Sequence, residues 1–227
     1  MLHLSQPLVV ASLTSDLVER AREADERGAD AVEVRLDLYG SDGDPVDSVR
    51  DLADSDVDLP VIATNRPTWE GGDFEGDEDA RVEILSRAAE YADAVDIELN
   101  ASDEVHGEVL DAADDAEATL IASYHDFDST PSYDEIRGVL SEAAEIGIPK
   151  LAVYAESRDD VLRLLEATLE HDGDVCTIAM GEKGSHSRVV APLYGSRLTY
   201  ASLGDDSTAP GQLTVSEVRQ TLDILLR

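Results

Sequence analysis

The sequence of 227 residues predicts a closed (β/α)8 barrel of the TIM type, formed by residues 1–227 as a single domain. Short apolar and β-branched runs recur eight times, and stretches with helical periodicity separate them. A doubly wound open sheet is the alternative, but that fold usually has fewer repeats and a glycine-rich turn after its first strand. Here Thr14, Ser15 and Asp16 follow the first run, so the closed barrel is favoured.

The eight predicted strands are residues 8–13, 31–37, 60–65, 94–99, 119–125, 149–155, 175–180 and 197–203. Helical spacing of apolar residues is clearest in segments 17–24, 82–92, 136–146, 161–168 and 214–225. The last of these opens with Thr214-Val215-Ser216-Glu217, a capping-box pattern that predicts a helix N-terminus at Thr214. Segments 40–44 and 204–211 carry the Gly, Pro and Asp residues typical of loops.

The charge of the chain is strongly negative, with 51 Asp and Glu residues against 17 Lys and Arg and a formal net charge of -34. Such a surface repels nucleic acid and anionic membranes, so neither is expected as a partner. Solubility alone is the simpler explanation of the charge. However, the acidic residues are spread along the whole chain, which favours a halophilic protein whose self-repulsion is screened by a salt-rich cytoplasm.

A cytoplasmic location is expected from three further observations. The single cysteine, Cys176, cannot form an internal disulfide and fits a reducing compartment. The N-terminus lacks a basic region followed by a long apolar core, so no signal peptide is predicted. No apolar run reaches the roughly 18 residues that a membrane-spanning helix needs. No metal is expected either, because His, Cys and Asp residues do not occur at the spacing of a zinc site.

Charged residues occupy the face of several strands that a closed barrel would turn inward. In segment 31–37 the apolar residues alternate with Glu33, Arg35 and Asp37, and the apolar face is expected to pack on the helices. A solvated edge strand would alternate in the same way, but a closed barrel has no such strand. Buried ionisable groups need polar partners, so a polyhydroxylated anionic ligand is expected. The same alternation places these residues inside the barrel: Thr64, Arg66, Asp96, Glu98, Ser123, His125, Lys150, Ala152 and Tyr154.

Lys150 is the first candidate catalytic residue. The chain contains only two lysines, Lys150 and Lys183, and its other Lys or Arg positions are all arginine. Lys150 stands inside the strand-like apolar run 148–154. Arginine stays protonated at biological pH, whereas a neutral lysine amine attacks carbonyl groups and forms imines. A lysine kept at this position therefore indicates imine chemistry.

Other polar residues stand at the C-terminal ends of the predicted strands, where barrel enzymes hold their chemistry. Each alone has an ordinary explanation: His125 as a capping residue, Arg66 and Arg188 as ion-pair partners, and Met180 as core. The joint arrangement of Lys150, His125 and the arginines nevertheless favours a catalytic site.

Together these residues resemble type I 3-dehydroquinate dehydratase, an enzyme family of the shikimate pathway. The resemblance follows family order along almost the whole chain. It rests on Glu33-Val34-Arg35-Leu36-Asp37, Arg66 with Glu70-Gly71-Gly72, Ser123-Tyr124-His125-Asp126-Phe127, Lys150-Leu151-Ala152, Ala179-Met180-Gly181, Ser187-Arg188 and Ala209-Pro210-Gly211-Gln212. It implies a hydro-lyase that removes water from 3-dehydroquinate by syn elimination and gives 3-dehydroshikimate, in the biosynthesis of aromatic amino acids.

The resemblance also implies a role for each matching residue. Lys150 would form a Schiff base with the C3 ketone, His125 would remove a C2 proton and then help the C1 hydroxyl leave, and Glu70 would orient that histidine. His125 is expected to titrate near its ordinary pKa, so that it serves as base and then as acid at neutral pH. Thr208 stands where the family often has serine, and it keeps the hydroxyl. The implied substrate-binding residues are Ser12, Glu33, Arg35, Arg66, Met180, Arg188, Thr208 and Gln212.

This chemistry requires no cofactor, and family members are commonly dimers, so a homodimer is expected. Two alternatives stay open at this point. A class I aldolase also uses a barrel lysine imine, but it cleaves a carbon–carbon bond, and residues 33–35 and 209–212 argue against it. A non-catalytic barrel that binds sugar acids would hold its ligand reversibly without forming an imine.

Overall fold

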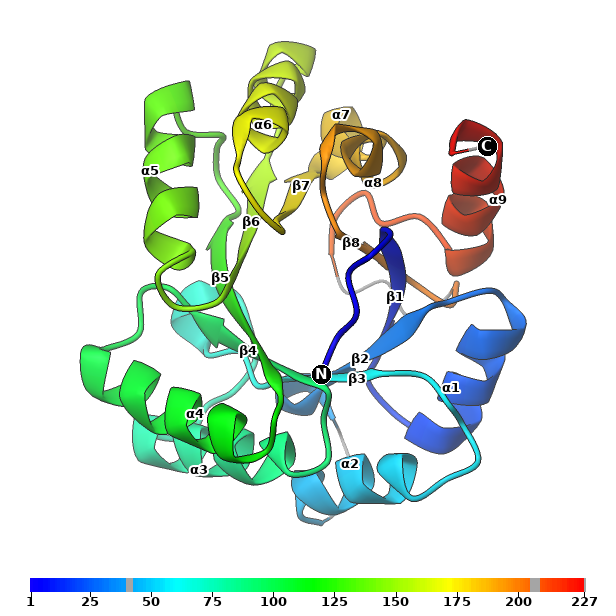
Figure 1. Cartoon of the computed structure of the whole chain (residues 1–227), viewed down its shortest axis with the longest axis vertical. Helices are drawn as coiled ribbons and strands as arrows, with labels where there is room; N and C mark the ends of the chain where they lie inside the picture. Colours follow the sequence, from blue (N-terminus) through cyan, green and yellow to red (C-terminus); the bar gives the residue numbers. More distant parts are fainter. Residues whose placement is uncertain (40–42, 205–208, 227) are drawn as a thin grey trace.

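The computed structural model describes residues 1–39, 43–204 and 209–226, and it confirms the predicted barrel. Its eight strands are parallel and follow the order β7-β6-β5-β4-β3-β2-β1-β8 in one sheet. Figure 1 looks down this ring of strands and shows the helices on its outside. Strands that are consecutive in sequence are therefore neighbours in space, as the repeated strand–helix pattern predicts.

The strands closely match their predicted segments. Their bounds are β1 (Leu8–Leu13), β2 (Ala31–Arg35), β3 (Val61–Thr64), β4 (Ala94–Glu98), β5 (Thr119–Asp126), β6 (Ile148–Tyr154), β7 (Cys176–Met180) and β8 (Leu198–Ala201). One shortening that affects the site is in β2, which ends two residues before the predicted segment because Leu36–Leu38 forms the 3-10 helix η1. Asp37, predicted inside a strand, therefore lies just past its end.

The helices are α1 (Leu17–Glu26), α2 (Pro45–Ala53), α3 (Glu78–Ala89), α4 (Asp103–Asp115), α5 (Tyr133–Ala143), α6 (Arg158–Glu170), α7 (Gly181–Gly184), α8 (Ser187–Val190) and α9 (Val215–Leu225), with the 3-10 helices η2 (Thr68–Glu70) and η3 (Ala191–Tyr194). Between β7 and β8 the chain forms three short helices, α7, α8 and η3, in place of one long helix. In the described part of the chain, no helix has the length and apolar character needed to cross a membrane.

The predicted capping box at the start of α9 is confirmed. The Thr214 hydroxyl accepts a hydrogen bond from the Glu217 N–H, and the Glu217 carboxylate accepts one from the Thr214 N–H. Both donors would otherwise lack a partner at the helix N-terminus. The cap thus fixes the point where α9 begins, as the chain turns from the C-terminal ends of the strands and returns along the outside of the barrel.

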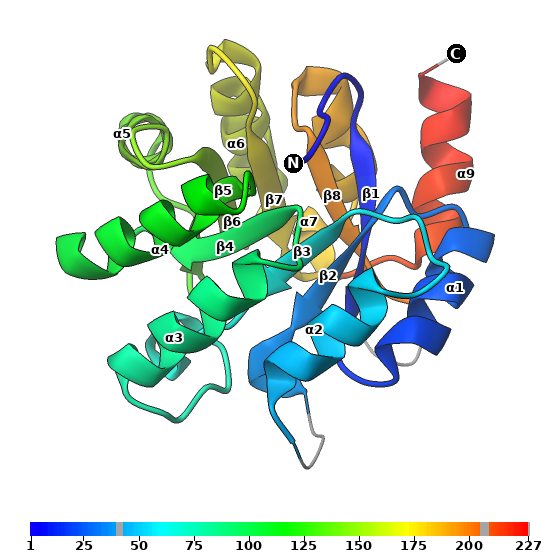
Figure 2. The same ribbon diagram turned by 60° about the horizontal axis from the view of Figure 1, so that its bottom comes forward.

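The outward face of the strands is apolar and packs on the helices. Val9 and Leu13 of β1 belong to one buried cluster with Leu17 of α1 and with Val218 and Leu222 of α9. Figure 2 shows α9 running along the outside of the barrel beside β1. Burial of each large apolar side chain contributes about 1.5–3 kcal/mol. This outer layer leaves the inward face free for polar residues.

The inward face is divided into an apolar half and a polar half. Toward the N-terminal ends of the strands, Val10, Ile62, Ile121 and Leu198 fill the interior, and Leu2 of the N-terminal segment joins them. Toward the C-terminal ends the inward side chains become polar while remaining buried. These are Ser12, Glu33, Arg35, Thr64, Arg66, Asp96, Glu98, Ser123 and Lys150. An apolar floor therefore lies beneath a polar chamber at the end where barrel enzymes bind their substrates.

The ring is closed between β7 and β8 by side chains as well as by backbone. An isolated bridge joins Val175 to Ser196. The thiol of Cys176 donates to the Leu198 carbonyl at 3.3 Å, and the Thr177 N–H donates to the Ser196 hydroxyl at 3.1 Å. The single cysteine thus has a structural place in the seam.

Candidate active site

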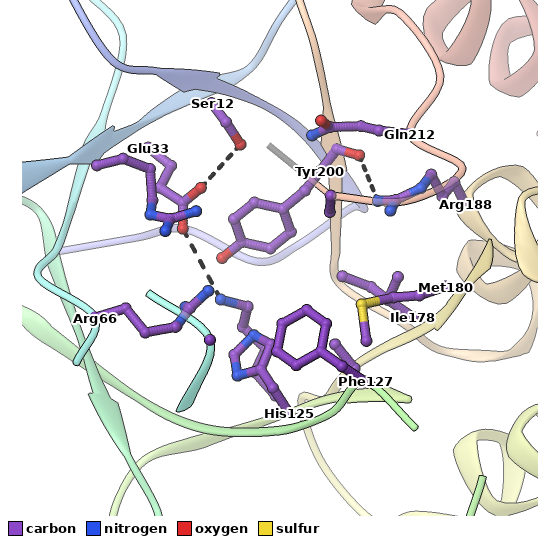
Figure 3. Close-up of a pocket in the computed structure, with 15 residues that line it drawn as sticks. Ser12, Glu33, Arg66, His125, Phe127, Ile178, Met180, Arg188, Tyr200 and Gln212 are labelled. Atoms are coloured by element: carbon purple, nitrogen blue, oxygen red, sulfur yellow. Dashed lines mark hydrogen bonds and ion pairs between the residues drawn. The ribbon is translucent and has the colours of Figure 1, made fainter. Parts of the chain in front are cut away.

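A cavity opens at the C-terminal ends of the strands and contains most of the predicted site residues (Figure 3). Its empty space is about 480 Å³, open solvent at the mouth included. Glu70 lies behind His125, and Thr208 lies outside the described residues. The lining residues are Ser12, Glu33, Arg35, Arg66, Gly71, His125, Phe127, Lys150, Ala152, Ile178, Met180, Arg188, Tyr200, Ala209 and Gln212.

Lys150 projects from β6 into the cavity, where its amine lies against buried carboxylates. Its Nζ donates to Asp96 Oδ2 at 2.6 Å and lies 3.9 Å from Glu33 Oε1. Asp96 also accepts from Ser123 Oγ at 2.8 Å and from Arg66 Nη2 at 3.3 Å. Because strand residues alternate, these inward positions on β4, β5 and β6 face one another. Asp96 is therefore the group that holds the amine in place.

Asp96 is fully buried and ionised. Burial opposes its ionisation, but the charges of Lys150 and Arg66, together with the hydrogen bonds from Lys150 and Ser123, outweigh that effect. The pKa of the Asp96 carboxyl is therefore held below its ordinary value. A carboxylate in this state can stabilise two neighbouring cations in a site that excludes water.

His125 projects from β5 and is held by Glu70. Glu70 Oε1 accepts the backbone N–H of His125 at 2.7 Å and lies 3.4 Å from its ring Nδ1. The chain turns sharply after Glu70, where Gly71 has a φ of 76°. A Cβ on Gly72 would lie 2.1 Å from the Arg66 carbonyl oxygen, so the turn also requires glycine there. The Glu-Gly-Gly motif is thus a turn that aims a carboxylate at the histidine.

Burial shifts the pKa of both members of this pair. Desolvation, and after it the positive charges of three nearby basic side chains, hold the pKa of His125 well below its ordinary value. The three are Arg66, Lys150 and Arg35. Burial raises the pKa of Glu70 to about 7, against the lowering effect of its hydrogen bond with His125. The expectation of an ordinary histidine pKa is therefore wrong, and the ring is neutral at pH 7.

Glu33 of β2 is the carboxylate among the described residues that line the cavity. Its Oε2 accepts from Ser12 Oγ at 2.8 Å, a contact drawn in Figure 3, and its Oε1 accepts from Thr64 Oγ1 at 3.0 Å. Arg35 faces the same side and forms a bidentate pair with Asp37, with contacts of 2.9 and 2.6 Å. This wall offers both donors and acceptors to the hydroxyl groups of a ligand.

Arg66 is positioned between the cavity and a buried ion pair. Arg81 of α3, which is fully buried, donates to Glu98 Oε2 at 2.6 Å, and Arg66 Nε lies 3.8 Å from Glu98 Oε1. Burial raises the pKa of Glu98 to about 7 despite the charge of Arg81. Together with Asp96, this arrangement fixes Arg66 from two sides.

Arg188 reaches the cavity from α8 without an acidic partner among the described residues. Its Nη1 donates to the Tyr200 carbonyl at 2.8 Å and its Nε donates to the Gly211 carbonyl at 3.2 Å. Within the described part of the chain its Nη2 has no hydrogen-bond partner. Burial lowers the pKa of this guanidinium to about 10, so it remains a cation at pH 7. A buried cation of this kind is stabilised when a ligand supplies the missing negative charge.

The segment that carries Gln212 is tied to the barrel close to Arg188. The Gly181 N–H donates to the Pro210 carbonyl at 3.2 Å. A Cβ on Gly211 would lie 2.5 Å from the Gly181 carbonyl oxygen, so this close approach requires glycine. Gln212 consequently lies at the cavity wall, with Met180 buried in the wall at the end of β7.

Asp96, Tyr200 and Phe127 contact predicted site residues but are not themselves among them. Asp96 is predicted to face inward, but the sequence gives it no role. Tyr200 lies two residues after inward-facing Leu198, so strand alternation predicts that Tyr200 also faces inward. Phe127 belongs to the same motif as His125, and their rings stack with centroids 5.9 Å apart. Among the residues described, no group of three or more His, Cys, Asp or Glu could hold a metal ion.

Comparison with known proteins identifies the family. The family model described as type I 3-dehydroquinase matches residues 7–227. The chain belongs to this family. The 3-dehydroquinate dehydratases of Methanocella arvoryzae and Haloquadratum walsbyi are 46% and 43% identical to it, over 96% and 95% of this chain and 97% and 91% of their own lengths. The crystal structure of the Aquifex aeolicus 3-dehydroquinate dehydratase has a TM-score of 0.86 and 33% identity, covering 97% of this chain and 99% of that one.

Membership of the type I 3-dehydroquinase family confirms the resemblance seen in the motifs. The chain is a hydro-lyase that converts 3-dehydroquinate to 3-dehydroshikimate in the shikimate pathway. The match extends along nearly all of the barrel, so the class I aldolase and the non-catalytic binding barrel are both set aside.

The substitution Glu70→Gln is expected to stabilise the folded protein at pH 8 and to change it little at pH 4.5. The folded pKa of Glu70, about 7, lies above the ordinary value of 4.5. The stability contributed by its protonated form is therefore full below pH 4.5 and is lost as pH rises through 7. Glutamine cannot ionise, so the variant should be more stable at pH 8 by at most about 3 kcal/mol.

Chemical denaturation at fixed salt concentration measures this difference. The matched control is Glu90→Gln, which makes the same substitution at an exposed position at the end of α3. A Glu70→Gln variant whose stability follows the wild-type pH profile would contradict the assignment of a raised pKa to Glu70.

Proposed function

We propose that residues 1–227 act as one catalytic domain that dehydrates 3-dehydroquinate through an imine on Lys150, with His125 as the acid–base group. The observation that carries this proposal is the common cavity of a buried amine, a neutral imidazole and an arginine without an acidic partner in the described chain. Each of the three has the chemistry that one part of the substrate requires. The amine matches the ketone, the imidazole the acidic C–H, and the arginine the carboxylate.

The substrate would be oriented by the contrast between the two sides of the cavity. Arg188 presents a planar fork that matches a carboxylate, and Gln212 lines the same cavity. Thr208, which lies outside the described residues, is proposed as a further substrate contact. The hydroxyl groups of the ring would face the side formed by Glu33, Arg35, Arg66 and Ser12, with Met180 in the wall. This orientation brings the C3 ketone to Lys150 and C2 to His125.

Imine formation begins with the loss of a proton from the ammonium of Lys150. Asp96, which accepts from Nζ at 2.6 Å, is the nearest acceptor for that proton. The free amine then attacks C3, the carbonyl oxygen becomes a hydroxyl, and this hydroxyl leaves as water when the carbon–nitrogen double bond forms. Over both steps the ammonium and the ketone give a protonated imine and one water, so the atoms and the charge balance.

The protonated imine acts as an electron sink for the elimination. His125, neutral at pH 7 because of its lowered pKa, removes a proton from C2, and the electron pair moves toward the imine nitrogen. The imidazolium then donates this proton to the C1 hydroxyl, which leaves as water while the C1–C2 double bond forms. Glu70, whose pKa is raised to about 7, lies beside Nδ1, and its ionised form stabilises the imidazolium between these steps. Hydrolysis of the imine releases 3-dehydroshikimate and restores Lys150.

Salt adaptation is the second part of the proposal. It is supported by the net charge of -34, by acidic residues along the whole chain, and by the similarity to the Haloquadratum walsbyi protein. Screening by molar salt shortens the range of repulsion between surface carboxylates to about 3 Å. The cytoplasmic location and the homodimer stay predictions, testable by fractionation of cells and by light scattering of the purified protein.

Borohydride reduction in the presence of 3-dehydroquinate is expected to leave a covalent adduct on Lys150 and none on Lys183. Reduction converts the imine to a stable amine, and peptide mass spectrometry locates it. Lys150→Ala should abolish dehydration while circular dichroism shows the barrel intact. The matched control is Lys183→Ala, because Lys183 is exposed on α7 and should not affect activity. An unmodified Lys150 in active, borohydride-treated enzyme would overturn the imine mechanism.

His125→Ala is expected to lower kcat by about 10²–10⁴-fold while borohydride still traps the imine. The reason is that the imidazole moves protons after the amine has bound the ketone. Ultraviolet absorbance of the conjugated enone measures turnover, and mass spectrometry measures trapping. His3→Ala is the control, since His3 is exposed and is not among the residues that line the cavity. Normal turnover by the His125 variant would show that another group carries the proton.

Activity and stability are expected to require potassium chloride at molar concentration. Dilution should lower the midpoint of thermal unfolding because exposed carboxylates repel one another when they are not screened. The comparison is with sucrose at equal osmolarity, which favours burial without screening charge and should therefore raise the unfolding midpoint less than potassium chloride does. Full activity and an unchanged unfolding midpoint in dilute buffer would contradict the salt adaptation.

A further inference from the structure

The hydroxyl group of Tyr200 has no assigned task in the mechanism above. Tyr200 lies on β8 and is only 5% exposed, and its hydroxyl has no hydrogen-bond partner among the described residues. A buried hydroxyl without a partner costs about 1–3 kcal/mol. The ring packs in an apolar cluster with Ile178, Met180 and Leu198, where a phenylalanine ring would fill the same space. The hydroxyl therefore needs an explanation that packing does not give.

The Tyr200 ring lies directly beside the reacting amine. Lys150 Nζ is 4.6 Å from the ring centroid, and Tyr200 is among the residues that line the cavity. Figure 3 shows the hydroxyl end of the ring directed toward the side of Glu33 and Arg66 and away from Arg188. The backbone carbonyl of Tyr200 accepts from Arg188, which fixes the strand at this point. The hydroxyl thus points to the region where the ketone must meet Lys150.

The other hydroxyl groups of this region are already engaged. Ser12 Oγ and Thr64 Oγ1 both donate to Glu33, at 2.8 and 3.0 Å, and Ser123 Oγ donates to Asp96 at 2.8 Å. In the described part of the cavity, the Tyr200 hydroxyl is thus the one whose proton is not committed to a carboxylate. Burial, followed by the charge of Glu33, raises the pKa of Tyr200 well above its ordinary value. The group consequently stays protonated and can donate.

We propose that the Tyr200 hydroxyl is a further catalytic group, which donates a hydrogen bond to the oxygen on the substrate carbon that Lys150 attacks. This inference rests on the proposed imine mechanism. As the nitrogen–carbon bond forms, the electron pair of the carbonyl double bond moves to oxygen. A donor aimed at that oxygen stabilises the negative charge that develops there, in the manner of an oxyanion hole. Tyr200 keeps its proton, and the leaving water takes both of its hydrogens from the Lys150 ammonium, by way of Asp96.

Tyr200→Phe tests the proposal because it removes one oxygen and keeps the ring. The variant should form the imine on the order of 10²-fold more slowly than wild type, as measured by rapid mixing with 3-dehydroquinate, borohydride quenching and mass spectrometry. Its unfolding midpoint should be equal to or above that of wild type, since an unpaired hydroxyl has been removed. Tyr133→Phe is the matched control, because the Tyr133 hydroxyl contacts Glu170 on the outer surface.

A second readout isolates the step at the ketone. In a His125→Ala background, which stalls elimination, reversible imine formation exchanges the ketone oxygen with solvent. Adding Tyr200→Phe should slow the loss of an oxygen-18 label from the ketone by a similar factor. Unchanged rates of imine formation and exchange, with only a raised KM, would show instead that the hydroxyl binds another hydroxyl of the substrate, and the proposal would be wrong. If wild-type enzyme traps no imine at all, the proposed mechanism itself fails, which is a separate outcome.

Discussion

The contact between Asp96 and Lys150 is the interaction on which the polar half of the barrel depends. A single fully buried carboxylate accepts from Lys150 Nζ at 2.6 Å, from Ser123 and from Arg66. Two cations held together in a water-excluding interior would destabilise the fold by several kcal/mol without such a counter-charge. The apolar floor formed by residues such as Ile62 beneath this cluster keeps the interior dry, which strengthens the pairing. In the proposed mechanism, the same carboxylate is also the nearest acceptor for the proton that the amine loses.

The other end of the cavity holds a buried cation, Arg188, that has no carboxylate partner among the described residues. Arg35 and Arg66 are paired with carboxylates of the protein, whereas Arg188 donates only to backbone carbonyls among the described residues. A ligand with one carboxylate is consequently attracted to Arg188, while its hydroxyl groups find mixed donors and acceptors on the far side. One orientation satisfies both ends. In the proposed mechanism, this asymmetry, rather than the presence of several arginines, aligns the ketone with Lys150.

Strand alternation made most of the fold and much of the site predictable from the sequence. It predicts that Glu33, Asp96 and Lys150 lie inside the barrel, because the apolar face of each strand packs on the helices and a closed barrel has no solvated strand face. It could not show that Asp96 lies 2.6 Å from an amine 54 positions away in sequence. Nor could it show that three cations and burial lower the pKa of His125. Distances between side chains of different strands set these properties, and a one-dimensional pattern does not contain them.

The sign of the charge reverses between the surface and the cavity. The chain as a whole carries a net charge of -34, yet an anionic substrate must enter a chamber that holds Lys150, Arg35, Arg66 and Arg188. At low ionic strength the field of the surface carboxylates extends about 30 Å and opposes the approach of an anion. In molar salt that field decays within about 3 Å, and the cations at the end of the barrel then dominate the local potential. In the proposed salt adaptation, screening therefore serves substrate capture as well as stability, and this would tie the acidic surface to the function of the site.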